Sequence, residues 1–308
     1  MIKQYKQDFY KLDYSIIEPG KIFDRNQIKH FLKIVKKSLP SYSNSSSNFN
    51  KKSFNNVKVY GLPLKFRSSR GQKLRNKVYS NYYGKRAVLE IHQWKIENTK
   101  ILIDIIANQN LLTLAKDILE TDKISFHNGS ISACYPGYPG VQSFHSDTGH
   151  FTISPEQAVL SRQEKQYQIN FIIYLNDVDK TVSPLCLIPS TFKKINKINN
   201  QVSKFYGSKL DKDSLSQGNP VYPELLSDLP ESSLKVTGSG GTVLCLNSGA
   251  LHRETENLTS NRTRYAILLT YTKFHSPFVK MYSKNFNEVR AVRRFCNLFD
   301  DKQIILKS

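Results

Sequence analysis

The sequence predicts a mainly β protein with helices on its flanks, and three observations lead to this fold class. Short runs rich in β-branched and aromatic residues, bounded by Gly, Pro, Asn or Asp, recur between residues 123 and 275. Helical periodicity is found before and after this region. A His-x-Asp pair and a distant His lie next to predicted strands, so that two packed sheets could bring the three side chains together.

The β-rich region contains several strands with a clear pattern. Residues 168–175 form a run that ends in a turn at 176–179. A glycine-rich turn at 238–241 leads into an apolar strand at 242–246, and residues 264–271 form another strand. Because alternate residues of a strand share a face, the first run places four apolar side chains together, namely Ile169, Phe171, Ile173 and Leu175.

Three segments outside this region are expected to be helical. Asp24 can cap a helix that buries Phe31 and Val35 and stops at Leu39-Pro40. A basic helix is expected at 286–298. Another helix at 108–119 places Leu111, Leu114, Ala115 and Ile118 on one side.

The chain is interpreted as a single domain, residues 1–308, because a sheet sandwich with helical additions usually has about this length. Its parts are an N-terminal helical and substrate-side region at 1–122, a β core at 123–275 and a C-terminal helix within 276–308. A polar insertion at 192–233 interrupts the core and is expected to cover the active site, since loops often carry specificity.

His145, Asp147 and His252 form the candidate metal site. Residues i and i+2 of a strand point to the same face, so that His145 and Asp147 can project inward together while Ser146 faces away. His252 would then come from another strand, on the opposite side of the sandwich. Two imidazoles and one carboxylate on one face of the metal are the ligand set of non-haem Fe(II) oxygenases, which leaves three coordination positions open.

The order of these segments resembles the phytanoyl-CoA dioxygenase-like family of Fe(II)- and 2-oxoglutarate-dependent oxygenases, over roughly residues 125–275. Two departures concern turns: the family usually has a glycine-containing turn where this chain has residues 181–184, and Pro-Gly-Ser-His where it has residues 189–192. The matching pieces are His145-x-Asp147, Leu175-Asn176-Asp177, Ser183-Pro184-Leu185, Pro189-Ser190-Thr191, and Leu251-His252 through Asn257 to Arg264.

The resemblance implies a double-stranded β-helix, a jelly-roll or cupin-like core, with Fe(II), 2-oxoglutarate and O2 as cofactor and cosubstrates. It also implies an inward-facing arginine that holds the distal carboxylate of 2-oxoglutarate, a role that suits the planar, always charged guanidinium. Arg264 shares the parity of Ala266, whereas Arg262 lies nearer the turn at 257–261. We favour Arg264 and keep Arg262 as the alternative.

Other polar residues near the ligand strands have less defined roles. Gln142, Tyr135 and Asn170 could hydrogen-bond the keto acid, or they could be ordinary polar groups of the sheet. Glu254, two residues after His252, could orient a ligand, but a solvated carboxylate is the reading we favour. The intact Asp147 argues against halogenation, for which relatives replace this carboxylate, and favours hydroxylation, desaturation or ring closure.

Charge and composition limit the partners. The formal net charge is +20, which favours an anionic substrate such as a polycarboxylate or a thioester, although an AT-rich genome could also give many lysines. No apolar stretch is long enough to span a membrane, and the N-terminus lacks the apolar segment of a signal peptide. The four cysteines, Cys134, Cys186, Cys245 and Cys296, are expected to be reduced thiols in a soluble, intracellular, cytoplasmic protein.

The leading hypothesis is an oxygenase that oxidises a C–H bond of a small, anionic metabolite in specialised metabolism. One alternative is an oxygenase that modifies nucleic acid, which the net charge alone motivates and which we do not favour. A second alternative is a basic binding module on the same scaffold without catalysis. The sequence leaves the substrate and the oligomeric state open.

Overall fold

The protein is described from a computed structural model. The structure describes residues 2–39, 58–60, 86–91, 99–138, 140, 168–191 and 233–273. The predicted helix at 286–298, the insertion at 192–232, and the segment that contains Gln142, His145 and Asp147 lie outside the described residues.

Two antiparallel sheets form the centre of the molecule, which confirms the prediction of a mainly β protein with flanking helices. The larger sheet has the strand order β1-β8-β5-β10-β4-β3-β2, and the smaller sheet has the order β7-β6-β9. The strands of the larger sheet are β1 (Tyr14–Ile17), β2 (Lys58–Tyr60), β3 (Arg86–Glu90), β4 (Ile124–Cys134), β5 (Gln168–Tyr174), β8 (Val243–Asn247) and β10 (Arg264–Lys273), and those of the smaller are β6 (Leu185–Leu187), β7 (Leu234–Val236) and β9 (His252–Glu254).

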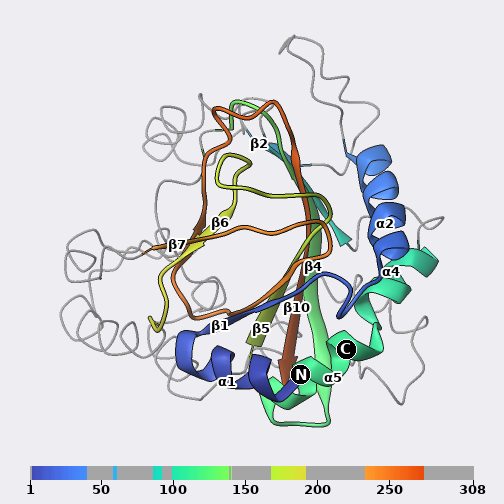
Figure 1. Cartoon of the computed structure of the whole chain (residues 1–308). Helices are drawn as coiled ribbons and strands as arrows, with labels where there is room; N and C mark the ends of the chain where they lie inside the picture. The colour runs from blue at the N-terminus through green and yellow to red at the C-terminus, as the bar shows by residue number, and fades with distance from the viewer. Residues whose placement is uncertain are drawn as a thin grey trace, which may run out of the picture.

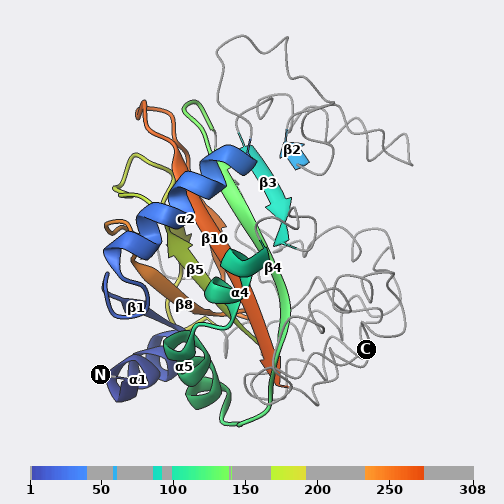
Figure 2. The ribbon, with the colours of Figure 1, turned by 90° about the vertical axis from the view of Figure 1, so that its right-hand side faces the viewer.

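Helices cover the outer face of the larger sheet, as Figures 1 and 2 show for α2, α4 and α5. Asp24 caps α2 in a reciprocal capping box with Gln27, and Leu39 ends the helix, as predicted. Asn108 accepts a hydrogen bond from the Leu111 amide and so begins α5. The described helices are α1 (Ile2–Leu12), α2 (Arg25–Ser38), α4 (Thr99–Ile106) and α5 (Gln109–Leu119).

The strands of the larger sheet divide their side chains between two apolar clusters. On β10, Ile267 and Leu269 lie in the cluster beneath the helices, whereas Ala266 lies in the cluster between the two sheets. On β5, the predicted face of Ile169, Phe171, Ile173 and Leu175 packs beneath the helices. The alternating pattern is therefore confirmed, and the face that carries Arg264 and Ala266 is the inner face of the sandwich.

The first helix and strand were not anticipated from the sequence. α1 packs against β1 and α5, and β1 forms the edge of the larger sheet by pairing with β8, with Ile17 opposite Val243. β1 has only four residues, with Asp13 in the left-handed conformation just before it. A strand this short has too few alternating residues to give a recognisable pattern.

Two further findings concern the cysteines and the helices; Cys296 lies outside the described residues. Cys134, Cys186 and Cys245 are buried and free, as the prediction of reduced thiols requires. In the described part of the chain, no helix has the length and hydropathy needed to cross a membrane.

Substitution of Asp24 by Ala should lower the free energy of unfolding by about 1 kcal/mol, because it removes the acceptor for two backbone amides at the start of α2. Urea denaturation measures the change, and Asp104→Ala, on the exposed side of α4, serves as the control. An equal effect of the two substitutions would contradict the role of the cap.

Candidate active site

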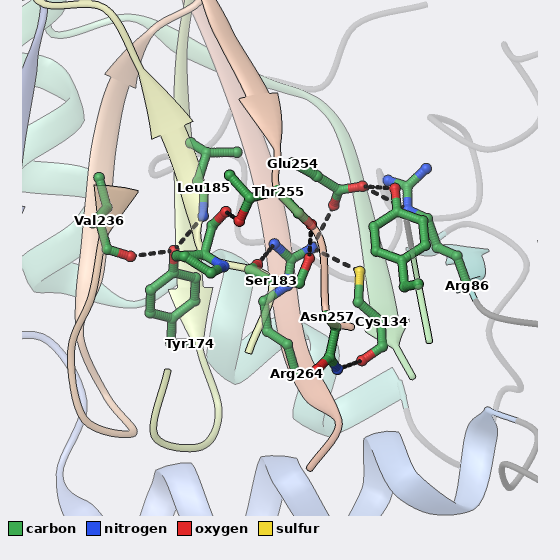
Figure 3. A network of polar contacts seen from close by, with 12 residues as sticks. Arg86, Cys134, Tyr174, Ser183, Leu185, Val236, Glu254, Thr255, Asn257 and Arg264 are labelled. Atoms are coloured by element: carbon green, nitrogen blue, oxygen red, sulfur yellow. Dashed lines mark hydrogen bonds and ion pairs between the residues drawn. The ribbon is translucent and has the colours of Figure 1, made fainter. Parts of the chain in front are cut away.

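Three residues with polar side chains lie side by side on neighbouring strands of the larger sheet. Arg86 on β3 is directly opposite Cys134 on β4, and Cys134 is directly opposite Arg264 on β10. Residues paired in this way point to the same face of a sheet. Two guanidinium groups therefore extend from the inner face, with a thiol between them, as Figure 3 shows.

Arg264 is almost completely buried, with 3% of its side chain exposed. Nη1 donates to the Ser183 carbonyl oxygen at 2.7 Å, and Nη2 lies 3.2 Å from Cys134 Sγ and pairs with Glu254. Nε has no hydrogen-bond partner in the described part of the chain. A buried guanidinium requires a counter-charge, since transfer of an unpaired ion out of water is costly.

Glu254 provides this charge from the opposite sheet, and it is shared between the two arginines (Figure 3). Oε1 accepts from Arg264, whereas Oε2 lies 2.8 Å from Arg86 Nε and accepts from the Tyr138 hydroxyl at 3.0 Å. Only 13% of the Glu254 side chain is exposed. The interpretation of Glu254 as a solvated carboxylate was therefore wrong, because the side chains of Arg86, Tyr138 and Arg264 contact the carboxylate between the two sheets.

Electrostatic interactions among Arg86, Glu254 and Arg264 keep all three side chains charged. Burial raises the pKa of the Glu254 carboxyl, but Arg86, Arg264 and Tyr138 lower it by more, so that its pKa is about 2. Burial alone would lower the pKa of Arg264, but the neighbouring Glu254 carboxylate raises it above its ordinary value. Burial raises the pKa of the Cys134 thiol, which therefore stays protonated beside the guanidinium.

His252 begins β9, two residues before Glu254, and is buried. Its Nδ1 lies 3.0 Å from the Ala250 carbonyl oxygen, which can only accept a hydrogen bond. This contact requires the proton on Nδ1, so that the lone pair resides on Nε2, the arrangement that an imidazole needs to bind a metal. Because His252 and Glu254 are at positions i and i+2 of one strand, both point toward the larger sheet.

A turn at the end of β6 holds the chain just before His252. Thr191 Oγ1 accepts from the Leu251 amide at 2.9 Å and donates to the Ile188 carbonyl oxygen at 3.0 Å. The Ile188 amide in turn donates to the Leu251 carbonyl oxygen. The Pro189-Ser190-Thr191 segment of the sequence therefore fixes the entry of the strand that carries His252.

Two turns of this chain have a non-glycine residue in the backbone conformation that glycine favours. Ser183 has φ of 51° and Ser190 has φ of 58°, both in the left-handed region. Hydroxyl groups offset the strain: Ser183 Oγ donates to the Thr255 carbonyl oxygen at 2.6 Å, and Ser190 Oγ donates to the Lys11 carbonyl oxygen at 2.9 Å. These turns thus keep their shape without glycine.

Gly140 lies against the end of β9. Gly140 has φ of 74°, and a Cβ there would lie 2.7 Å from the Thr255 carbonyl carbon and 3.0 Å from the Glu254 carbonyl oxygen. Asn257 Nδ2 donates to the carbonyl oxygens of Cys134 and Arg262, so that it joins the end of β4 to the loop before Arg264. Only glycine allows so close an approach at position 140.

The structure separates the two candidate arginines. Arg262 has 46% of its side chain exposed and pairs with Asp179 at the surface, whereas Arg264 lies on the inner face as expected. Asn170 is buried and accepts a hydrogen bond from Thr270 Oγ1 at 2.8 Å. Tyr135 belongs to the apolar cluster beneath the helices, away from the face that carries Arg264.

His252 is the one member of the predicted metal triad that the structure describes, since His145 and Asp147, like Gln142, fall outside the described residues. Within the described ranges no group of three His, Cys, Asp or Glu side chains could hold a metal. Arg86 was not predicted as a site residue from the sequence, because no motif surrounds it. Its only signal was the Arg-Ala-Val-Leu-Glu strand pattern, which does not reveal its neighbours.

Comparisons with known proteins identify a similar fold but no sequence family. No protein-family model matches this sequence, and no curated protein matches it. Among solved structures, the chain is similar to the non-heme alpha ketoglutarate dependent epimerase SnoN from nogalamycin biosynthesis, with a TM-score of 0.55, 9% identity, and coverage of 88% of this chain and 83% of that chain.

Two further solved structures have a similar fold. EctD from S. alaskensis, in its apoform, has a TM-score of 0.54 and 15% identity over 89% of this chain and 77% of that chain. AviO1 from Streptomyces viridochromogenes Tue57 has a TM-score of 0.54 and 12% identity over 90% of this chain and 97% of that chain. At such identities the similarity shows the fold, and it confirms the predicted jelly-roll core.

Substitution of Thr191 by Val should lower the free energy of unfolding by about 1–3 kcal/mol, because it leaves the buried Leu251 amide without its acceptor. Thermal or urea denaturation measures the effect. Thr113→Val, on the exposed side of α5, removes a hydroxyl without such a contact and is the control. A Thr191→Val protein as stable as this control would rule out a supporting role for the turn.

Proposed function

We propose that this protein is an Fe(II)- and 2-oxoglutarate-dependent oxygenase that oxidises a C–H bond of a small, anionic metabolite. One observation carries the proposal: a buried arginine and a buried histidine project from facing sheets into the interior of a jelly roll. The structures with a similar fold support it, since they include the epimerase SnoN in complex with Fe3+, alpha ketoglutarate and nogalamycin RO, and EctD with 2-oxoglutarate and 5-hydroxyectoine.

The described residues fit a metal at His252. Its Nδ1 hydrogen bond to Ala250 directs the lone pair to Nε2, and the ring is buried among side chains of the sandwich. Gly140 lies against β9, and His145 follows only five residues later, a span of at most about 18 Å. A chain of this length allows His145, and Asp147 two residues beyond it, to reach the same ion, and we assign them as its other ligands.

Arg264 fits the distal carboxylate of 2-oxoglutarate. It is buried on the inner face, its orientation is fixed by Ser183, and its Nε proton lacks a partner among the described residues. Glu254 already contacts it, which shows that this guanidinium can hold a carboxylate at this depth. Arg262, which is exposed and paired with Asp179, lacks these properties.

The roles of the protein's own residues follow from these positions. Bound iron would activate O2 with electrons from the keto acid, and 2-oxoglutarate would leave as succinate and CO2. His252, His145 and Asp147 would hold the metal, and three protein ligands of this kind would leave room for the cosubstrates. Arg264 orients the keto acid, and the apolar side chains between the sheets exclude water from that side.

The charge of the chain supports an anionic substrate. The formal net charge of +20 raises the local concentration of anions near the surface. A polycarboxylate or a thioester would satisfy this condition. Hydroxylation, desaturation and ring closure all remain within the proposed reaction type, because each begins with oxidation of a substrate C–H bond.

Replacement of His145, Asp147 or His252 by Ala should reduce succinate formation from 2-oxoglutarate by at least about a hundredfold, since even residues outside a metal's direct ligands can change activity 10- to 100-fold. Uncoupled turnover of labelled 2-oxoglutarate with Fe(II) measures the rate without knowledge of the substrate. Bound Fe(II), measured by anaerobic equilibrium dialysis, should fall in parallel.

The controls for this experiment are His30→Ala and Asp122→Ala, both exposed and away from the inner face. They should retain the activity and the iron content of the wild type. Undiminished succinate formation in all three ligand variants would remove the proposal.

Arg264→Lys should raise the KM for 2-oxoglutarate about tenfold, because a lysine keeps the charge but loses the planar pair of N–H donors. The kcat at saturating 2-oxoglutarate should change much less, since the contact is made in the ground state as well as in the transition state. The surface substitution Arg262→Lys is the matched control, and it should leave KM unchanged. The reverse ranking of the two variants would assign the role to Arg262.

A further inference from the structure

The Glu254 carboxylate already contacts Arg264, the residue to which we assign the binding of 2-oxoglutarate. A side chain of the protein itself therefore holds the position that the cosubstrate would take. Arg264 has three acceptors among the described residues: a carbonyl oxygen, a protonated thiol and the Glu254 carboxylate. Of these, only Glu254 carries a charge. An incoming carboxylate from a ligand would seek the same guanidinium protons.

The two oxygens of Glu254 have separate anchors. Oε1 contacts Arg264, and Oε2 contacts Arg86 and the Tyr138 hydroxyl. The guanidinium groups of Arg86 and Arg264 start from residues two strands apart, about 10 Å between their Cα atoms. Glu254 can therefore give up Arg264 through rotation of its side chain and still keep a charged partner in Arg86.

On the basis of the proposed function, the geometry points to Glu254 as an internal carboxylate that competes with 2-oxoglutarate for Arg264 and thereby sets the affinity for the cosubstrate. In the absence of ligand, Glu254 neutralises the buried Arg264. When the distal carboxylate binds, Glu254 Oε1 leaves Arg264 and the carboxylate remains with Arg86 and Tyr138. Glu254 thus lowers the affinity of the cosubstrate site for carboxylates.

A different role for Glu254 would change the affinity for 2-oxoglutarate in the opposite direction. If Glu254 only oriented Arg264 for the keto acid, its loss would let the guanidinium move, and 2-oxoglutarate would bind more weakly. If it competes, the loss of its charge leaves Arg264 in need of an anion, and 2-oxoglutarate binds more tightly. The sign of the change in affinity therefore distinguishes an orienting residue from a competing one.

Glu254→Gln is the direct variant, because glutamine keeps the shape and the hydrogen-bonding capacity but removes the charge. Isothermal titration of the full-length protein, metal-free and loaded with Mn(II), measures the Kd of 2-oxoglutarate and of glutarate. Glutarate has the two carboxylates but no 2-oxo group. We expect both ligands to bind about tenfold more tightly than to the wild type, since charged contacts exceed neutral ones by about 1.4 kcal/mol.

Glu256→Gln is the matched control. Glu256 lies in the same loop, but its carboxylate pairs with Lys235 and is 42% exposed. Its substitution removes one negative charge at nearly the same place in the chain, so that a general change of surface charge would appear in both variants. Unchanged Kd values for Glu256→Gln, together with tighter binding for Glu254→Gln, support the inference.

Tyr138→Phe tests the inference without the removal of a buried charge, in case Glu254→Gln does not fold. The phenyl ring keeps the packing, but Oε2 loses its hydroxyl donor, and Glu254 is then held less well on the side of Arg86. Once Oε1 has left Arg264, the carboxylate is less neutralised, so that its hydrogen bond with the Tyr138 hydroxyl is stronger than in the ligand-free state. Loss of the hydroxyl therefore destabilises the ligand-bound state more, and the Kd of 2-oxoglutarate should increase about threefold, for a difference of part of one charged hydrogen bond. An unchanged or lower Kd in this variant would overturn the inference.

The outcomes separate this inference from the proposed function. If the wild type converts 2-oxoglutarate but Glu254→Gln binds it equally or more weakly, the oxygenase proposal stands and the role of Glu254 as a competitor is rejected. If neither the wild type nor any variant binds 2-oxoglutarate with metal present, both proposals fail. Tighter binding by Glu254→Gln, with a larger thermal stabilisation by 2-oxoglutarate than in the wild type, supports both.

Discussion

A single carboxylate shared by two guanidinium groups governs the arrangement of the two sheets around the site. Glu254 extends from the smaller sheet, whereas Arg86 and Arg264 extend from the larger sheet. Because these charges are largely removed from water, each depends on the others, and separation of the sheets would leave a buried charge without a partner. The position of His252 follows from the same contact, since it lies two residues before Glu254 on the same face of β9.

Hydrogen bonds between buried side chains and the backbone also join the two sheets. The Tyr174 hydroxyl accepts from the Leu185 amide and donates to the Val236 carbonyl oxygen, so that one side chain of the larger sheet joins two strands of the smaller sheet. Thr255 Oγ1 donates to the Pro184 carbonyl oxygen, which holds the chain beyond β9 to the turn before β6. These buried groups have their hydrogen bonds satisfied across the sandwich, and such contacts define the spacing of the sheets more strictly than apolar packing does. The site is thus carried by elements whose positions are held from both sides.

The sequence predicted those parts of the fold that depend on periodicity and on local capping. The alternation of Ile169, Phe171 and Ile173 identified the face of β5 beneath the helices, and the Asp24 cap identified the start of α2. Parity also placed Arg264 on the inner face. The sequence did not predict the pairing of Glu254 with Arg86 and Arg264, because these residues lie on three strands of two different sheets. The register of β3, β4 and β10 aligns the two arginines, and the packing of the smaller sheet on the larger brings Glu254 to them. Nor did it indicate β1, which is too short for a pattern and depends on β8 for its existence as a strand.

We propose that the histidine of β9 shares one metal ion with His145 and Asp147 beside Arg264. Anomalous diffraction from crystals grown without oxygen in Mn(II) and 2-oxoglutarate can test this proposal, since the manganese signal locates the ion independently of the protein atoms. We expect one manganese peak in direct contact with His252 Nε2, His145 and Asp147, with the keto acid between the ion and the guanidinium of Arg264. A manganese peak away from His252, or a keto acid without contact to Arg264, would refute the proposed site.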